Sequence, residues 1–289
     1  MNVLIAGLGL LGGSIGLALK DHPDYTVWAL GRNTERLNKA LEAGIVSRIA
    51  TEPEALVPEA DIIVLCTPVG TIPRMAESLV HLLKPDACVT DIGSTKGWIC
   101  QNMVRILGDN KGAFLGAHPM AGSEKTGFEH AKPDLFAGHP IVLTKTGFET
   151  DHTLTTIEQF WSTLSTNIYW MDPDSHDTTV AITSHLPHAA AFTMAYYLSS
   201  REEARDNFFG IYGKGLLDTL RIAASDAVMW EDIMKTNRVN IADALEEYKD
   251  LIGVLENWIR TGKHHEIAAL IQKAGTMCRQ LSENHTAGE

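Results

Sequence analysis

The stretch "NVLIAGLGLLGGSIG" (residues 2–16) spaces three glycines as Gly-x-Gly-x-x-Gly between an apolar run and a helical pattern. In such a strand–turn–helix unit the first glycine permits a tight turn and the second lets the backbone approach a pyrophosphate. The third allows close helix packing, and the helix N-terminus favours the anion. We therefore expect a dinucleotide site, although an ordinary glycine-rich turn is the alternative. The residues expected there are Gly7, Gly9, Leu10, Leu11 and Gly12.

The apolar runs that follow alternate with helical patterns up to about residue 171, and "NIYWMDP" (167–173) is the last strand-like run. Strands separated by helices indicate crossover connections and a parallel sheet covered on both faces. The sequence thus predicts an α/β fold with a Rossmann-type, doubly wound, mostly parallel sheet over residues 1–172. An all-α domain is expected over residues 173–289, with Pro187 kinking one long helix.

The composition is that of a globular protein, with 45% apolar and 21% charged residues among 289. A net charge of −12 and the absence of any Lys/Arg-dense stretch argue against nucleic-acid binding. Four cysteines without a CxxC pair indicate a reducing compartment. No apolar run approaches the ~18 residues of a membrane span, and the N-terminus lacks the basic segment of a signal peptide. We expect a cytoplasmic protein that binds no membrane.

The second strand, "YTVWALGRN" (25–33), bears on the choice of dinucleotide. An acidic residue at its end would bind the ribose hydroxyls of NAD. Arg32 stands there instead and could bind the 2′-phosphate of NADP, so NADP is favoured and NAD is possible. The alternative is that Arg32 merely faces solvent. Thr67 and Pro68, in "LCTPVGTIP" (65–73), follow another strand and are expected at the same ligand-binding edge.

Two further strand ends carry candidate catalytic residues. "TDIGSTKG" (90–97) brings Ser94 and Lys96 to this edge, although Ser94 could equally be the N-cap of the next helix. "LGAHPMAGSEKTGFEHA" (115–131) brings His118, whose neighbours include glycines and a proline that are typical of a loop. We therefore expect His118 in an active-site loop rather than in the core.

Three motifs together resemble the prephenate/arogenate dehydrogenase family of tyrosine biosynthesis: "GAHPMAGSEKTG" (116–127), "SHLPHAAAF" (184–192) and "GLLDTLRIAASDAVMW" (215–230). The resemblance covers nearly the whole chain. The length leaves no room for the chorismate mutase or regulatory domains of some relatives, so it implies the monofunctional form.

The resemblance implies an oxidative decarboxylation of prephenate to 4-hydroxyphenylpyruvate, with arogenate, which gives tyrosine, as the alternative substrate. Hydride passes to the nicotinamide, the ring hydroxyl loses a proton, and carbon dioxide leaves as the ring becomes aromatic. His118 matches the family's catalytic histidine, and an imidazole suits a base that must be neutral at working pH. Ser94 matches a serine that bonds both the substrate hydroxyl and that histidine.

The same resemblance implies which side chains bind the substrate. Arg221 matches an arginine that grips a substrate carboxylate, and without the resemblance it would be taken for a solvated helix residue. His185 and His188 share a helix face, but no third metal ligand accompanies them, so no metal is expected. The residues implied for substrate binding are Arg221, His185, His188, Ser123 and Glu124.

The partners expected are a small-molecule substrate and a second copy of the chain, bound through the helical domain as is the habit of the family. Two alternatives remain. β-Hydroxyacid dehydrogenases and imine reductases share the two-domain plan but would carry a lysine in the first long helix, and residues 174–200 contain none. A non-catalytic NADP-binding sensor would require neither His118 nor Arg221.

Overall fold

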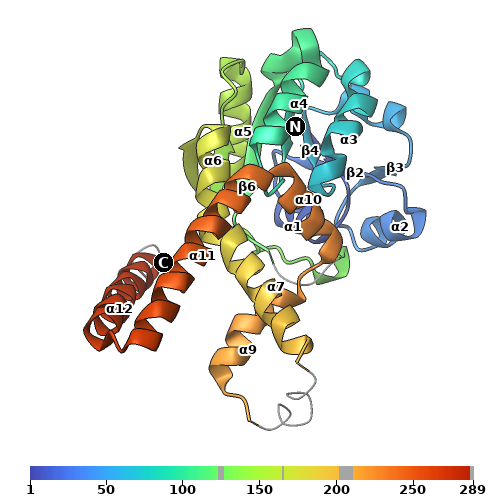
Figure 1. Ribbon diagram of the computed structural model, residues 1–289. Coiled ribbons are helices and arrows are strands. Elements are labelled where there is room, and N and C mark those ends of the chain that lie inside the picture. Colours follow the sequence, from blue (N-terminus) through green and yellow to red (C-terminus); the bar gives the residue numbers. More distant parts are fainter. Residues whose placement is uncertain (123–126, 165, 202–210, 287–289) are drawn as a thin grey trace. The chain divides into compact units, whose positions relative to one another are not determined.

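The computed structural model describes residues 1–122, 127–164, 166–201 and 211–286 (Figure 1). They form two compact units, residues 1–238 and 239–289. The strands are β1 (Asn2–Ala6), β2 (Thr26–Leu30), β3 (Arg48–Ala50), β4 (Ile62–Leu65), β5 (Cys88–Asp91), β6 (Phe114–Pro119), β7 (Pro140–Thr144) and β8 (Asn167–Met171). The α-helices are α1 (Leu10–Leu19), α2 (Thr34–Glu42), α3 (Ile72–Leu79), α4 (Gly97–Leu107), α5 (Asp151–Thr163), α6 (Pro173–Val180), α7 (Leu186–Ser199), α9 (Lys214–Arg221), α10 (Ala227–Thr236), α11 (Arg238–Thr261) and α12 (His264–Thr286). None of the helices described could cross a membrane, being too short or too polar.

The described strands form one eight-stranded sheet in the order β3-β2-β1-β4-β5-β6-β7-β8. The first six are parallel, and their order is that of a doubly wound dinucleotide-binding sheet. β7 runs antiparallel to β6, and β8 runs parallel to β7. The predicted fold, a mostly parallel sheet followed by helices, is confirmed. The predicted division at residue 172 remains a prediction.

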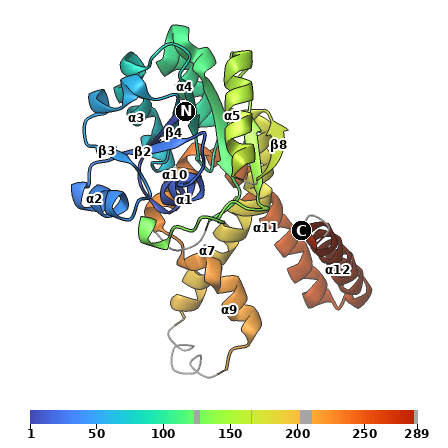
Figure 2. The same cartoon turned by 180° about the vertical axis from the view of Figure 1, so that it is seen from behind.

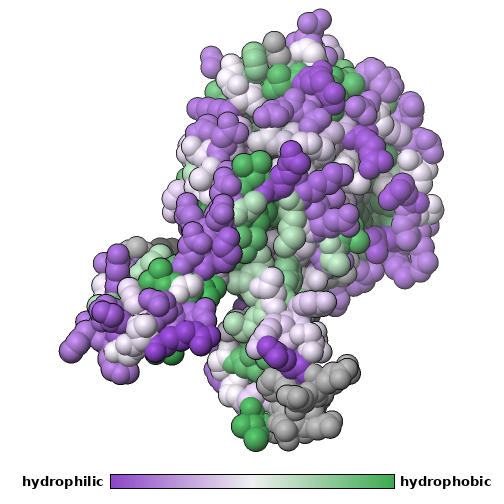
Figure 3. Space-filling model, in the orientation of Figure 1, coloured by the Kyte–Doolittle hydropathy of each residue, from purple (hydrophilic) through white to green (hydrophobic). Residues whose placement is uncertain are grey.

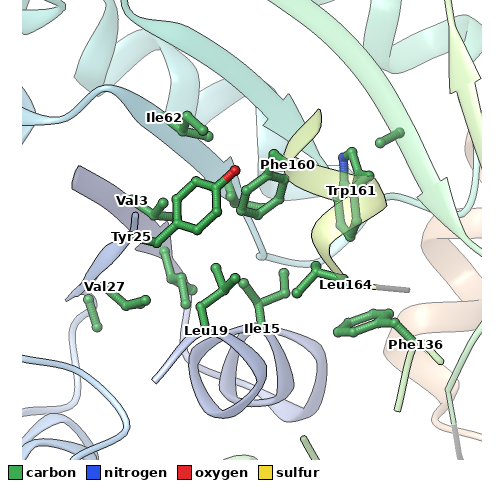
Figure 4. Packing of buried hydrophobic residues seen from close by; sticks show 14 of the residues in the cluster. Val3, Ile15, Leu19, Tyr25, Val27, Ile62, Phe136, Phe160, Trp161 and Leu164 are labelled. Atoms are coloured by element: carbon green, nitrogen blue, oxygen red, sulfur yellow. The ribbon is translucent and has the colours of Figure 1, made fainter. Parts of the chain in front are cut away.

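Helices cover both faces of the sheet, and the strand sequences explain why (Figures 1 and 2). Alternate residues of a strand point to opposite faces, so a strand buried on both sides is apolar throughout. In β1, Val3 and Ile5 enter the core that contains α1 and α5, while Leu4 and Ala6 enter the core that contains α3 and α4. Figure 4 shows the first core, where Tyr25 and two aromatic residues of α5 pack over α1.

Two of the three motif glycines are required by the fold itself. Gly7 has a φ of +109°, and a Cβ there would lie 2.8 Å from the carbonyl oxygen of Cys66. A Cβ on Gly12 would lie 2.5 Å from the carbonyl oxygen of Gly7. Gly9, in contrast, has nothing within 4 Å of the position a Cβ would take. The turn and the helix packing therefore account for Gly7 and Gly12, and the space at Gly9 is open.

His118 lies inside strand β6 and not in the loop that was expected. The β5–β6 ladder ends at Thr90 and Leu115, but β6 continues because β7 pairs with it as far as Pro119. A Cβ on Gly116 would lie 2.4 Å from Thr144 Oγ1, so this glycine permits close packing of the two strands. The loop prediction was wrong because the antiparallel pairing with β7 extends the strand by four residues.

The long helix predicted around Pro187 is interrupted one turn earlier than expected. Residues Ala181–His185 form a π-helical segment between α6 and α7, and Pro187 occupies the first turn of α7. Because the π-helical segment runs directly into α7, Pro187 lies within a continuous helical stretch, where its missing N–H removes one helical hydrogen bond. The wider π turn precedes the proline, and His185 lies at its end.

The second unit contains most of α11 and all of α12, two helices joined at Gly262, which has a φ of +67°. Glycine at a positive φ is the usual end of a helix. Several large apolar side chains of this unit are exposed, which is unusual for a surface and typical of an interface. They include Leu251, Ile252, Ile259, Ile271, Met277 and Leu281.

Gly12→Ala should lower the free energy of unfolding by about 1–3 kcal/mol, because the added methyl group meets the Gly7 carbonyl oxygen at 2.5 Å and the Ile5 side chain at 2.9 Å. Gly9→Ala is the matched control and should change it by less than about 0.5 kcal/mol. Urea denaturation of both variants measures the difference. Equal losses of unfolding free energy in the two variants would show that the close contact at Gly12 is not the reason for a glycine there.

Candidate active site

The carboxyl ends of the parallel strands bring the candidate residues to one edge of the sheet. Gly7 and Gly9 follow β1, Thr67 follows β4, and Ser94 follows β5. His118 lies next to last in β6, which is parallel to β5 and therefore ends at the same edge. This is the edge at which ligands bind in open α/β sheets.

His118 is buried, and its ring is held by a chain of two hydrogen bonds that continues into α6. Nδ1 of His118 lies 2.8 Å from Nε2 of His176. Nδ1 of His176 lies 2.8 Å from Oδ1 of Asp177. The His176 side chain is fully buried and Asp177 is 4% exposed, so water does not compete for these bonds.

Asp177 also forms the N-terminal cap of α4. Its Oδ1 accepts the backbone N–H of Lys96 at 2.7 Å, and its Oδ2 accepts that of Gly97 at 2.9 Å. A carboxylate at a helix N-terminus is stabilised by the helix dipole and by the unpaired N–H groups. Since Asp177 supplies the cap, the alternative that Ser94 is the N-cap of this helix was wrong; within the described residues the Ser94 hydroxyl has no hydrogen-bond partner.

These contacts determine which nitrogen of each ring carries the proton. The Asp177 carboxylate only accepts, so Nδ1–H of His176 donates to it. Nε2 of a neutral His176 then accepts, and Nδ1–H of His118 donates to it. Neutral His118 therefore keeps the lone pair on Nε2, the nitrogen outside the chain. An imidazole oriented in this way can act as a base.

Burial and neighbouring positive charge keep both rings neutral. The pKa of His118 lies well below its usual value, mainly because burial disfavours the charged form, with His176, Lys96 and His185 adding repulsion. Burial also lowers the pKa of His176, although its bond to Asp177 opposes the shift. His118 is therefore unprotonated at neutral pH.

The two other predicted histidines surround an indole ring. His185 is buried, its ring centre is 5.8 Å from that of Trp230, and its Nδ1 accepts from Asn237 at 3.2 Å. The ring of His188 lies 4.3 Å from Trp230, and its Nδ1–H donates to the Ser184 carbonyl. The indole N–H of Trp230 is buried and has no hydrogen-bond partner within the described residues. A donor is thus available beside both histidines.

A cleft of about 700 Å³ lies at the glycine turn and extends to the end of β2. It fits a dinucleotide, since the space beside Gly9 is open and the Thr67 hydroxyl is buried without a partner in the part of the chain that is described. Arg32 lines it as predicted, and so does Arg36, one turn into α2, which the sequence reasoning missed. The lining residues include Gly7, Gly9, Arg32, Asn33, Arg36, Thr67 and Pro68.

Not every predicted residue joins this site. Arg221 is the last residue of α9, where it is exposed; Figures 1 and 2 show α9 beside α7 and away from the sheet. Ser123 and Glu124 lie outside the described residues. These three assignments stay predictions.

His176 and Asp177 were missed by the sequence reasoning, although a signal was present. Asp172 and Pro173 mark the start of a helix, and Asp172 caps it. His176 and Asp177 then fall on the helix face that they share with Val180 and Ala181, which are buried. Two polar residues on an apolar face indicate buried hydrogen bonds.

The chain is similar to known prephenate dehydrogenases, as its sequence motifs indicated. The family model described as "Prephenate dehydrogenase, nucleotide-binding domain" matches residues 15–170, and the one described as "Prephenate dehydrogenase, dimerization domain" matches residues 172–273. The chain is 34% identical over 252 residues to prephenate dehydrogenase of Bacillus subtilis, covering 86% of this chain and 67% of that protein. It is 29% identical over 290 residues to cyclohexadienyl dehydrogenase of Zymomonas mobilis, covering 99% and 94%.

Among solved structures, prephenate dehydrogenase from A. aeolicus in complex with hydroxyphenyl propionate and NAD+ matches with a TM-score of 0.90 and 31% identity, covering 97% of this chain and 98% of that one. The fold and the site define a dinucleotide-dependent dehydrogenase. The chain belongs to the prephenate dehydrogenase family, as its motifs indicated.

The neutral histidines should make the protein less stable in acid. Burial lowers the pKa of His185 to about 4, whereas an unfolded histidine has a pKa of about 6.5. Between these pH values the unfolded chain binds a proton that the folded chain does not, so the free energy of unfolding falls as the pH falls. One such group contributes up to about 1.4 kcal/mol per pH unit.

His185→Asn should remove about one proton from this slope, while His118 and His176 still contribute to it in the same direction. Urea denaturation of both proteins between pH 4.5 and 7.5 measures how steeply the free energy of unfolding changes with pH in each. This range spans most of the interval between the folded and unfolded pKa values of His185. Identical slopes would contradict a buried, neutral His185.

Proposed function

We propose that the chain oxidises and decarboxylates prephenate to 4-hydroxyphenylpyruvate, with His118 as the base. The observation that carries the proposal is the uncharged imidazole of His118, held by His176 and Asp177 at the sheet edge that also carries the dinucleotide turn. Membership of the prephenate dehydrogenase family supports the substrate.

A bound nicotinamide supplies the hydride acceptor. Nε2 of His118 takes the proton of the ring hydroxyl as that hydroxyl becomes a carbonyl. The half-buried Ser94 hydroxyl, on the neighbouring strand end, orients the substrate hydroxyl toward this nitrogen. A positioned base is worth about 10²–10⁴ in rate.

His176 and Asp177 act on the proton that His118 receives. When His118 becomes an imidazolium, its Nδ1–H bond to His176 strengthens, and the Asp177 carboxylate balances the new charge through His176. Such a chain fixes the tautomer and the ring orientation before substrate arrives. Because Asp177 is anchored by the backbone N–H groups of Lys96 and Gly97 at the start of α4, the geometry does not depend on a flexible side chain.

The substrate carries two carboxylates, which a protein of net charge −12 does not attract by its overall charge. The unpartnered indole N–H of Trp230, which lies beside His188 and His185, offers a local donor. Arg221, whose exposed guanidinium forms no ion pair within the described residues, is assigned to a carboxylate through the family motif.

Initial rates of reduced nicotinamide formation test the proposal, with prephenate or arogenate and with NADP+ or NAD+. We expect turnover of prephenate. His118→Asn should lower kcat by about 10²–10⁴ and leave cofactor binding unchanged. Turnover of arogenate alone would change the assigned substrate and leave the assigned active-site residues unchanged. No turnover in any combination would favour a non-catalytic NADP-binding sensor.

We infer that NADP is the preferred cofactor. Arg32 and Arg36 line the adenosine end of the cleft, and neither side chain has an ion-pair partner among the described residues. The residues directly after β2 (31–33) and the residues that line the cleft include no carboxylate that would repel a 2′-phosphate. Planar guanidinium groups bind phosphate through paired hydrogen bonds.

Arg32→Ala should weaken NADP binding by at least ten-fold and NAD binding by less than three-fold, because only NADP carries the 2′-phosphate. Titration calorimetry with each dinucleotide measures both constants. Lys39→Ala is the matched control, since Lys39 is an exposed cation of α2, the helix that follows Arg32, and pairs with Glu35. Equal losses of affinity for NADP and NAD in the Arg32 variant would show that Arg32 does not bind the 2′-phosphate.

We also infer that the chain forms a homodimer through its helical region. The family model for residues 172–273 is described as a dimerization domain. Large apolar side chains reach the surface there, among them Ile182, Met194, Tyr196 and Tyr197, and Figure 3 shows apolar residues at the surface over the helices of the first unit. Exposed apolar surface of this kind is stabilised by a partner.

A further inference from the structure

Lys96 and Asp91 form an ion pair that is completely buried beside the candidate active site. Asp91 ends β5, and Lys96 lies immediately before α4. Both side chains are 0% exposed, and the pair is not part of the hydrogen-bonded chain from His118 to Asp177.

The pair holds the residue before each of the two predicted catalytic residues. Oδ1 of Asp91 accepts the backbone N–H of Ala117 at 3.1 Å, and Nζ of Lys96 donates to the Ala117 carbonyl at 2.7 Å. Oδ2 of Asp91 accepts the backbone N–H of Gly93 at 2.8 Å. Ala117 precedes His118, and Gly93 precedes Ser94.

These bonds replace a missing part of the sheet. The ladder between β5 and β6 ends at Thr90 and Leu115, two residues before Ala117. Beyond that point β5 no longer supplies backbone partners on this side of β6. The carboxylate and the ammonium supply them instead, so the strand stays in place where His118 needs it.

Stability alone does not explain a charged pair at this position. Burial strips both charges of water, and well-packed apolar residues of similar volume are often at least as stable as a buried ion pair. An apolar pair, however, could not bond the backbone of Ala117 and Gly93. The contacts therefore indicate that the pair serves the position of the backbone.

We propose that Asp91 and Lys96 are positioning residues that fix the strand end of His118 and the loop of Ser94 as one unit. The inference rests on the proposed function for its kinetic test but not for its spectroscopic one.

The groups that face His118 come from three segments. Lys96 acts from the loop before α4, His176 from α6, and His185 from the π-helical segment, and each lowers the pKa of His118 in addition to burial. Among these three, Lys96 is the one whose side chain also bonds the backbone next to His118. Its removal should therefore raise the pKa of His118 as well as loosen the strand end.

The double variant Asp91→Asn, Lys96→Met tests the proposal, because it removes both charges and leaves no lone charge in the core. Titration of the His118 imidazole by NMR should show a higher pKa than in the unchanged protein. With prephenate, kcat should fall at least ten-fold, and the acid limb of kcat/KM should move to higher pH. Lys96→Arg, which keeps the cation, should retain the low pKa.

Asp61→Asn, Lys84→Met is the matched control. It removes another Lys–Asp ion pair, one that precedes β4 and β5 at the opposite edge of the sheet. This variant should keep the wild-type kcat and His118 titration. An unchanged titration and kcat in the Asp91/Lys96 variant, or an equal loss in the control, would overturn the proposal. If the wild-type protein does not turn over prephenate, the proposed function fails, and the His118 titration alone then tests the role of Asp91 and Lys96. The two failures can therefore be told apart.

Discussion

The Asp177 carboxylate is the contact on which the candidate site depends. Its Oδ2 accepts the backbone N–H of Gly97, and its Oδ1 accepts both the backbone N–H of Lys96 and the Nδ1–H of His176. One anion thus joins a helix that covers the sheet to a helix that follows its last strand. Without it, α4 would lose its cap and His176 would lose the bond that sets its tautomer. The orientation of His118 follows from that tautomer.

The sheet makes this contact possible by bringing distant segments to one edge. His118 comes from β6, Lys96 from the loop between β5 and α4, and Asp177 from α6, after β8. Strands β7 and β8 reverse direction relative to the first six, and β7 extends β6 far enough to carry His118 past the end of β5. Within the first unit, Thr236 of α10 bonds Thr95, and Asp232 bonds the Gly70 N–H near the nucleotide cleft. The helices after β8 therefore hold both halves of the site.

Local patterns predicted much of this arrangement. The glycine turn was found because its three positions act within one strand–turn–helix unit, and Thr67, Ser94 and His118 were found because parallel strands end at a common edge. The strand around His118 was misplaced, since its length depends on β7, more than twenty residues away. His176 lies 58 residues from His118, and no local pattern connects them. Lys96 was expected at this edge, but its bond to Ala117 and that of Asp91 were not predicted, because they replace a ladder whose end only the folded sheet defines.

The chemistry of the candidate site requires His118 to be an uncharged base whose free nitrogen is Nε2. The ¹⁵N chemical shifts of the imidazole nitrogens of His118 and His176, measured at neutral pH, test it most directly. We expect both rings to carry their single proton on Nδ1, and Nε2 of His118 to have the shift of an unprotonated nitrogen. A proton on Nε2 of His118, or on both of its nitrogens, would show that His118 is not held as a base in this way.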